Sequence, residues 1–176
     1  TWTPANGMVL DLNGKSITAN GAFDTITVGE NVNFTLTDCK GGDESANYGS
    51  VTHGMQNWST RYQGRGVMVS AGGHFTMYGG CVGPNLTTDA GAGVYVAEGG
   101  HLAMYGGEIG GNVVSATGGN VGGGIWTAGT VTIGGSAKIT GNLAPEFGGV
   151  YVSGGTLTLR DSAKVTDNNA SVRTNS

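Results

Sequence analysis

Five segments of this 176-residue chain repeat one pattern of apolar residues, and this repeat limits the folds that the chain can adopt. Each segment has an apolar anchor with a second apolar residue two positions later; the anchors are Phe34, Phe75, Leu102, Val131 and Leu157. Another apolar pair with period two precedes most anchors, such as Val94 and Val96 before Leu102. Period two is typical of a β-strand with one buried face. A repeat of about 25 to 31 residues built from such strands predicts a solenoid, in which each repeat forms one coil.

Glycine marks the corners of the predicted coils. The chain contains 36 glycines, many of them in pairs that follow a strand, such as Gly99-Gly100 and Gly106-Gly107. A glycine-rich chain could be collagen-like, but collagen needs abundant proline, and this chain has only three prolines. A chain that turns after every short strand needs positive φ angles, which glycine adopts without steric cost.

An asparagine recurs three residues after the last apolar position of four repeats. These asparagines are Asn85, Asn112, Asn142 and Asn168. We expect them to form a column that points inward at a turn, with each side-chain amide bonded to backbone and to the next coil. This interpretation is structural and assigns the column no binding role.

The number and distribution of charged residues argue against some classes of function. Charged residues make up 11% of the chain, and the net charge is −4. The eight lysines and arginines are scattered, which argues against nucleic-acid binding. No apolar stretch approaches the ~20 residues of a membrane span. The composition, rich in threonine, asparagine and glycine, favours an extracellular or cell-surface location, and we expect the natural chain to be longer.

The repeat predicts a single all-β domain over residues 1–176, with three short strands in each of about five coils. We expect residues 1–24 to cap one end, with Leu10, Leu12 and Ile17 covering the core. One repeat is longer than the others, which places an inserted loop at 40–63. If Val51 is the missing strand residue of that repeat, most of the insertion precedes it. Residues 169–176 form a polar tail.

Three segments carry a resemblance to a known superfamily: Val9–Ile17 (VLDLNGKSI), Phe34–Gly42 (FTLTDCKGG) and Gly148–Val152 (GGVYV). They resemble the Gly-rich right-handed parallel β-helix repeats of secreted or surface-attached bacterial proteins, in the pectate-lyase-like superfamily. The resemblance implies a right-handed parallel β-helix. That superfamily includes lyases, glycoside hydrolases, adhesins and passive stalks, and no catalytic motif of its enzymes matches this chain.

The two cysteines, Cys39 and Cys81, fall at nearly equivalent places of successive coils by their spacing from the anchors. They are close enough in this alignment for a disulfide to form. Two buried free thiols are the other interpretation.

Aromatic side chains gather in one outward column of the predicted solenoid. The outward residues of the first strands are Thr27, Met68, Tyr95, Trp126 and Tyr151. Tyr95, Trp126 and Tyr151 are therefore expected to form an exposed strip on which sugars stack. Lateral packing between coils, or shielding by a loop, is the alternative. Trp58 and Tyr62, in the inserted loop, are further ligand-binding candidates. The alternative is a solvated loop in which Trp58 packs down as a lid.

Two other outward columns give weaker signals. His74 and His101 should be neighbours, but a third metal ligand is not evident, so we predict neither a metal nor another cofactor. Regular threonines can order water on an ice-binding surface. Here Ala103 interrupts the column of Thr35, Thr76, Thr132 and Thr158.

Catalysis is poorly supported. A glycosidase needs two carboxylates held about 5 to 10 Å apart across a cleft. Asp43 and Glu44 lie in a Gly/Ser-rich loop that would position them loosely. We therefore predict a non-catalytic module that binds a glycan or another host or cell-surface ligand. The alternatives are a polysaccharide-active enzyme that uses Asp43, Glu44, His53, Arg61 and Arg65, and a passive stalk.

Overall fold

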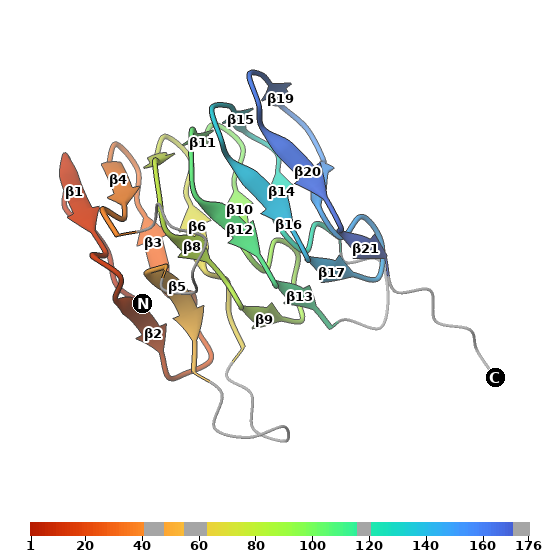
Figure 1. Ribbon diagram of the computed structural model, residues 1–176, viewed down its shortest axis with the longest axis horizontal. Helices are drawn as coiled ribbons and strands as arrows, with labels where there is room; N and C mark the ends of the chain where they lie inside the picture. The colour runs from red at the N-terminus through yellow and green to blue at the C-terminus, as the bar shows by residue number, and fades with distance from the viewer. Residues whose placement is uncertain (41–47, 55–62, 116–120, 171–176) are drawn as a thin grey trace.

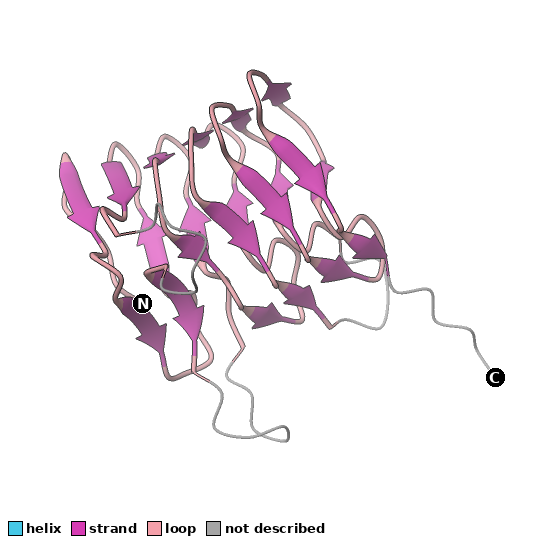
Figure 2. Ribbon diagram, viewed as in Figure 1, coloured by secondary structure: helices cyan, strands magenta, loops and turns pink. Residues whose placement is uncertain are grey.

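The chain folds into a parallel β-helix of about five coils, as the computed structural model shows (Figures 1 and 2). The structure describes residues 1–40, 48–54, 63–115 and 121–170. Every strand in these ranges pairs in parallel with the equivalent strand of the neighbouring coil, so the all-β fold predicted from the repeat is confirmed. Among the described residues there is no helix that could span a membrane.

The strands form four sheets that run along the column. The first sheet contains β3 (Ile26–Val28), β6 (Val67–Val69), β10 (Val94–Val96), β14 (Ile125–Thr127) and β18 (Val150–Val152). The second contains β1 (Met8–Asp11), β4 (Asn33–Thr37), β7 (His74–Met77), β11 (His101–Met104), β15 (Thr130–Ile133) and β19 (Thr156–Leu159).

The third sheet contains β2 (Ser16–Ala19), β5 (Ser50–His53), β8 (Cys81–Val82), β12 (Glu108–Gly110), β16 (Lys138–Thr140) and β20 (Lys164–Thr166). The fourth contains β9 (Leu86–Thr87), β13 (Val113–Val114), β17 (Leu143–Ala144) and β21 (Asn169–Ala170). These fourth strands follow the asparagine column and are not predicted by the sequence pattern, because two residues are too short to show alternation.

Like residues stack on like residues inside the column. Phe34 pairs with Phe75, Phe75 with Leu102, and the series continues through Val131 to Leu157. The rings of Phe34 and Phe75 stack with centroids 5.7 Å apart. A fully buried side chain of this kind stabilises the fold by about 1.5–3 kcal/mol. The predicted inward positions are therefore confirmed as the core.

Val51 is the strand residue that the long repeat seemed to lack. It pairs with Ile17 on one side and Val82 on the other, within the third sheet. The segment 40–63 therefore contains strand β5, flanked by residues outside the described ranges.

Residues 1–24 cover the N-terminal end by adding a coil. Strands β1 and β2 pair with β4 and β5, and Trp2 forms a bridge with Ile26. The indole of Trp2 lies edge-on against Phe34, with ring centroids 5.6 Å apart. The N-terminal region is thus built by the same strand pairing as the rest of the column.

The predicted asparagine column is a continuous hydrogen-bonded ladder, which we call the asparagine ladder (Asn85, Asn112, Asn142 and Asn168). Asn112 shows its pattern: the backbone N–H and Nδ2 both donate to Oδ1 of Asn142, at 3.0 and 2.9 Å. Nδ2 also donates to the Val82 carbonyl at 2.9 Å. Oδ1 of Asn112 accepts from Asn85 in turn. The ladder therefore supplies hydrogen-bond partners to the side-chain amide of Asn112, which is completely buried.

His53 adjoins the base of the ladder, one residue before Gly54, which holds the asparagine position of that coil in the register. Its side chain is 5% exposed, and Nδ1 lies 2.8 Å from Oδ1 of Asn85. Nε2 lies 2.7 Å from the carbonyl oxygen of Phe23. His53 therefore joins the ladder to the corner that precedes β3.

The two cysteines are free thiols that do not share a column. Cys81 pairs with Ser50 and Glu108 in the third sheet, whereas Cys39 lies after β4 and is exposed. The near-equivalence that the spacing suggested is therefore wrong, because the corner after β4 is longer than the corner after β7. Burial raises the pKa of Cys81 to about 12, and the Glu108 carboxylate acts in the same direction.

We predict that Asn112→Ala lowers the free energy of unfolding by about 3 kcal/mol, because it leaves several buried partners without hydrogen bonds. Asn112→Asp keeps the shape of the side chain but removes the Nδ2 donor, so it should destabilise as well. Asn168→Ala, at the end of the ladder, should cost only about 1 kcal/mol. Urea unfolding measures all three. Equal losses for Asn112→Ala and Asn168→Ala would contradict a ladder that stabilises through its buried interior.

We predict that iodoacetamide at pH 8 modifies Cys39 before Cys81 in the folded protein. Cys39 is exposed, although its hydrogen bond with the Asp11 carboxylate raises its pKa. Cys81 has almost no thiolate at that pH. Peptide mass spectrometry after timed quenching gives both rates. In denaturant without reductant, iodoacetamide should modify both thiols. If it modifies neither of them there, the two cysteines form a disulfide.

Candidate functional site

The candidate site is built on the outward face of the first sheet. Strand alternation turns Tyr95, Trp126 and Tyr151 outward, and the parallel register places each beside the next. We call these three residues the aromatic strip. All three side chains are half-buried. The structure therefore brings together the three strand residues that the sequence singled out.

Both faces of Tyr95 are covered. Its ring stacks on Trp126 with centroids 4.3 Å apart and planes 5° from parallel. The guanidinium of Arg65 lies over the Tyr95 ring, 4.8 Å from its centroid. Because Arg65 belongs to the preceding coil and Trp126 to the following one, they cover opposite faces. A ligand can reach the edge and hydroxyl of Tyr95, but a sugar ring cannot stack on its face.

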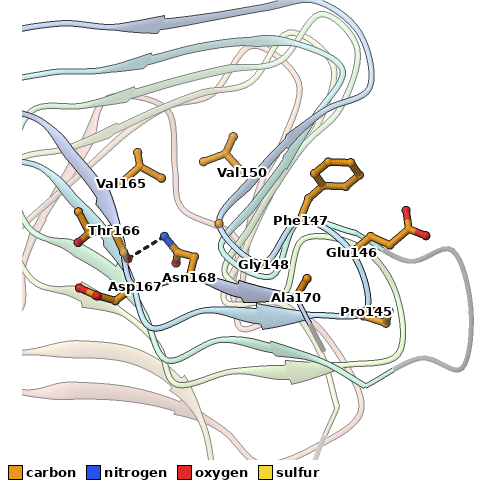
Figure 3. A pocket seen from close by; sticks show the side chains of 11 residues that line it. Pro145, Glu146, Phe147, Gly148, Val150, Val165, Thr166, Asp167, Asn168 and Ala170 are labelled. Carbon is orange, nitrogen blue, oxygen red and sulfur yellow. Dashed lines mark hydrogen bonds between the residues drawn. The ribbon is translucent and has the colours of Figure 1, made fainter. Parts of the chain in front are cut away.

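Phe147 extends the aromatic strip at its C-terminal end. Its ring packs against Tyr151 with centroids 5.2 Å apart at a 37° tilt, and the side chain is 56% exposed. Figure 3 shows Phe147 beside Val150 at the rim of the last coil. The aromatic surface at this end therefore comprises the half-buried side chains of Trp126 and Tyr151 and the exposed ring of Phe147.

The backbone of Phe147 is left-handed, with φ of +52°. The equivalent residues of the two preceding coils are Gly91 and Gly122, both at φ +73°. Hydrogen bonds link the three positions: Gly91 N donates to Gly122 O, and Gly122 N donates to Phe147 O. A left-handed conformation costs a residue with a side chain about 1–2 kcal/mol. The fold therefore tolerates a strained backbone where it exposes a large aromatic ring.

A polar groove of about 390 Å³ adjoins the strip through Arg65, and we call it the Arg65 groove. Its lining residues are Thr1, Ala22, Phe23, Asp24, Gln63, Gly64, Arg65, Thr87, Thr88 and Asp89. The guanidinium lies 3.5 Å from a carboxylate oxygen of Asp24 and 3.5 Å from one of Asp89. Nε donates to the Ala90 carbonyl at 3.0 Å. These contacts fix Arg65 between the groove and Tyr95.

The remaining predicted site residues divide into two groups. Trp58 and Tyr62 lie outside the described residues, as do Asp43, Glu44 and Arg61 of the enzyme alternative. His53 is described, but it is buried and both ring nitrogens face oxygen atoms of the protein. His53 is therefore not available to a substrate, and Arg65 is held by two carboxylates.

The second sheet offers a different outward surface. His74 and His101 stack with ring centroids 4.4 Å apart and planes 2° from parallel, as their register predicts. They line a shallow hollow of about 210 Å³ with Thr76, Ala103, Thr130 and Thr132. Within the described ranges, no group of three or more His, Cys, Asp or Glu side chains is placed to hold a metal ion.

Sequence reasoning missed Phe147, Asp24 and Asp89. A signal for Phe147 was present, because glycine stands three residues before Val94 and Ile125, whereas phenylalanine stands three residues before Val150. Asp24 and Asp89 lie at corners of different coils, outside any strand register. No local pattern could have shown that they meet at Arg65.

We predict that Phe147→Gly is more stable than Phe147→Ala by about 1 kcal/mol, since only glycine relieves the left-handed backbone. Both variants lose the ring contact with Tyr151, so the difference between them isolates the backbone term. At an ordinary position alanine is the more stable residue. Thermal or urea unfolding gives the comparison. An alanine variant as stable as the glycine variant would rule out strain at this position.

Comparison of the chain with protein-family models, with curated proteins and with solved structures finds no match. The strand pairing described above is the evidence for the parallel β-helix. Membership of the pectate-lyase-like superfamily stays a prediction.

Proposed function

We propose that this chain is a non-catalytic binding module of a bacterial secreted or cell-surface protein, and that the aromatic strip with Phe147 is its ligand-binding surface. The observation that supports the proposal most directly is Phe147. Its ring is more than half exposed on a backbone that glycine would occupy without strain. Such strain is concentrated at functional sites, because selection for stability alone removes it.

The chemistry of the surface favours a glycan. Aromatic faces stack on the C–H faces of sugars, and the half-buried rings of Trp126 and Tyr151 lie beside the exposed ring of Phe147. Beside them, the carboxylates of Asp24 and Asp89, which hold Arg65, offer acceptors to hydroxyl groups. An extended chain of sugars that lies parallel to the axis would meet the rings first and the Arg65 groove next.

The two alternatives have less support. The enzyme alternative relies on His53 and Arg65 among the described residues, and both are engaged within the protein. A passive stalk is consistent with the uninterrupted core ladders. It gives no reason for the conformation of Phe147.

We expect a glycan-array screen of the full chain to find saturable binding that Trp126→Ala and Phe147→Gly each weaken about tenfold or more, the effect of losing about 1.4 kcal/mol. Tyr78→Ala is the matched control. Tyr78 is 57% exposed and stacks on Tyr105 next to the second sheet, away from the strip. Circular dichroism would check that each variant is folded.

Binding that Tyr78→Ala reduces as much as Trp126→Ala does would move the site away from the strip. A parent that binds none of the glycans would favour the stalk or a protein ligand. Turnover of a bound polysaccharide would favour the enzyme.

A further inference from the structure

Charge is distributed unevenly between the sides of the column. The side that carries the aromatic strip consists of the first sheet and the two corners that flank it in each coil. The acidic and basic side chains that the structure describes on this side are Asp24, Glu30, Asp89, Glu98, Glu146 and Arg65. Five negative charges and one positive charge give this side a net charge of −4, which equals the net charge of the whole chain.

The rest of the described column is electrically balanced. The second and third sheets and the corners that follow them contain equal numbers of basic and acidic side chains. The basic residues are Lys15, Lys40, Lys138, Arg160 and Lys164, and the acidic residues are Asp11, Asp38, Glu108, Asp161 and Asp167. The excess negative charge therefore lies on the side of the aromatic strip, where it attracts positively charged ligands.

Arg65 does not cancel this excess beside the strip. Its guanidinium lies 3.5 Å from a carboxylate oxygen of Asp24 and 3.5 Å from one of Asp89. Two carboxylates around one guanidinium leave one negative charge on the group. The Asp89 side chain is 69% exposed, so its carboxylate is open to a ligand.

The rings of the aromatic strip also favour a positive charge. The guanidinium of Arg65 lies 4.8 Å from the ring centroid of Tyr95, so one ring of the strip already holds a cation over its face. An ammonium group is attracted to an aromatic face in the same way, and indole gives the strongest attraction. Trp126 is the next ring of the strip, stacked on Tyr95. A ligand on the strip would therefore gain from an ammonium group as well as from C–H groups.

Building on the glycan-binding function proposed above, we propose that the ligand of the aromatic strip is a cationic glycan, whose sugars carry unacetylated amino groups. The C–H faces of such sugars stack on the rings, and their ammonium groups meet the Asp89 carboxylate and the aromatic faces. Acidic sugars are repelled by this side of the column. Neutral sugars gain nothing from its charge.

Oligosaccharides that differ in charge test the proposal. The probes are glucosamine oligomers, N-acetylglucosamine oligomers of the same length and linkage, and galacturonate oligomers. Calorimetry with the full chain at about pH 5.5 keeps the sugar amines protonated. The glucosamine oligomer should bind about tenfold more tightly than its acetylated counterpart, and the galacturonate oligomer should not bind. Added sodium chloride should reduce this difference, because salt screens exposed charges.

Asp89→Asn and Glu98→Gln each remove one negative charge beside the strip. Each should weaken binding of the glucosamine oligomer about threefold and affect the acetylated oligomer less. Glu108→Gln is the matched control, since it removes the same charge from the third sheet, where Glu108 pairs with Lys138. At an ionic strength of about 0.1 M, charges more than about 10 Å apart are largely screened, so the control should bind as the parent does.

Circular dichroism would check the folding of every variant. Glu98 is exposed and lies outside the strands, so Glu98→Gln keeps the test valid if Asp89→Asn, which removes a partner of Arg65, fails to fold.

Four results would overturn the proposal. Binding of the acetylated oligomer that is as tight, and that Trp126→Ala still weakens, would leave the strip as the site of a neutral glycan. Loss of affinity in Glu108→Gln equal to that in Asp89→Asn would indicate attraction to the overall charge. An oligolysine that binds as tightly as the glucosamine oligomer would indicate a basic peptide as the ligand. Absence of binding to the glucosamine oligomer would exclude a cationic glycan, whereas the glycan array decides separately whether the strip binds any glycan.

Discussion

The alignment of each coil with the next depends on the side-chain amides that are buried between them. An asparagine inside an apolar column is costly unless each of its polar atoms has a partner. Asn112 and Asn142 find those partners only when the coils are stacked in register, since a shift by one residue would turn the amide to the outside. The same shift would turn the inward apolar residues of each strand to the outside. The asparagine ladder and the apolar core therefore specify the same register.

The ladder also explains how one end of the column differs from the other. At its base, His53 meets Asn85 and the Phe23 carbonyl, so the series ends on a buried partner. At its top, Asn168 meets only its own coil and the coil below. Trp2 covers Phe34 at the N-terminal end, while Leu159 is more than half exposed at the C-terminal end. The N-terminal end thus has both the buried hydrogen-bond partner and the covered core, and the C-terminal end has neither.

The sequence predicted the parts of the structure that depend on spacing within a strand. Alternation and the repeat were enough to identify the inward ladders, the strip of Tyr95, Trp126 and Tyr151, and the place of Val51. Contacts that residues make at the corners could not be predicted from the sequence. Arg65 covers Tyr95 because Arg65 is a corner residue whose side chain reaches over the next coil, and corners vary in length. The same variation separated Cys39 from Cys81.

Translational symmetry of the asparagine ladder has a consequence for how such a chain can change in length. A duplicated coil inserted between Asn112 and Asn142 would present the same amide, the same apolar positions and the same corner glycines to both neighbours. The hydrogen bonds of the ladder across each boundary would repeat those that already join its coils. Recombination within the gene can therefore add or remove a whole coil without a new kind of interface, and the surface along the column lengthens by one strand spacing each time.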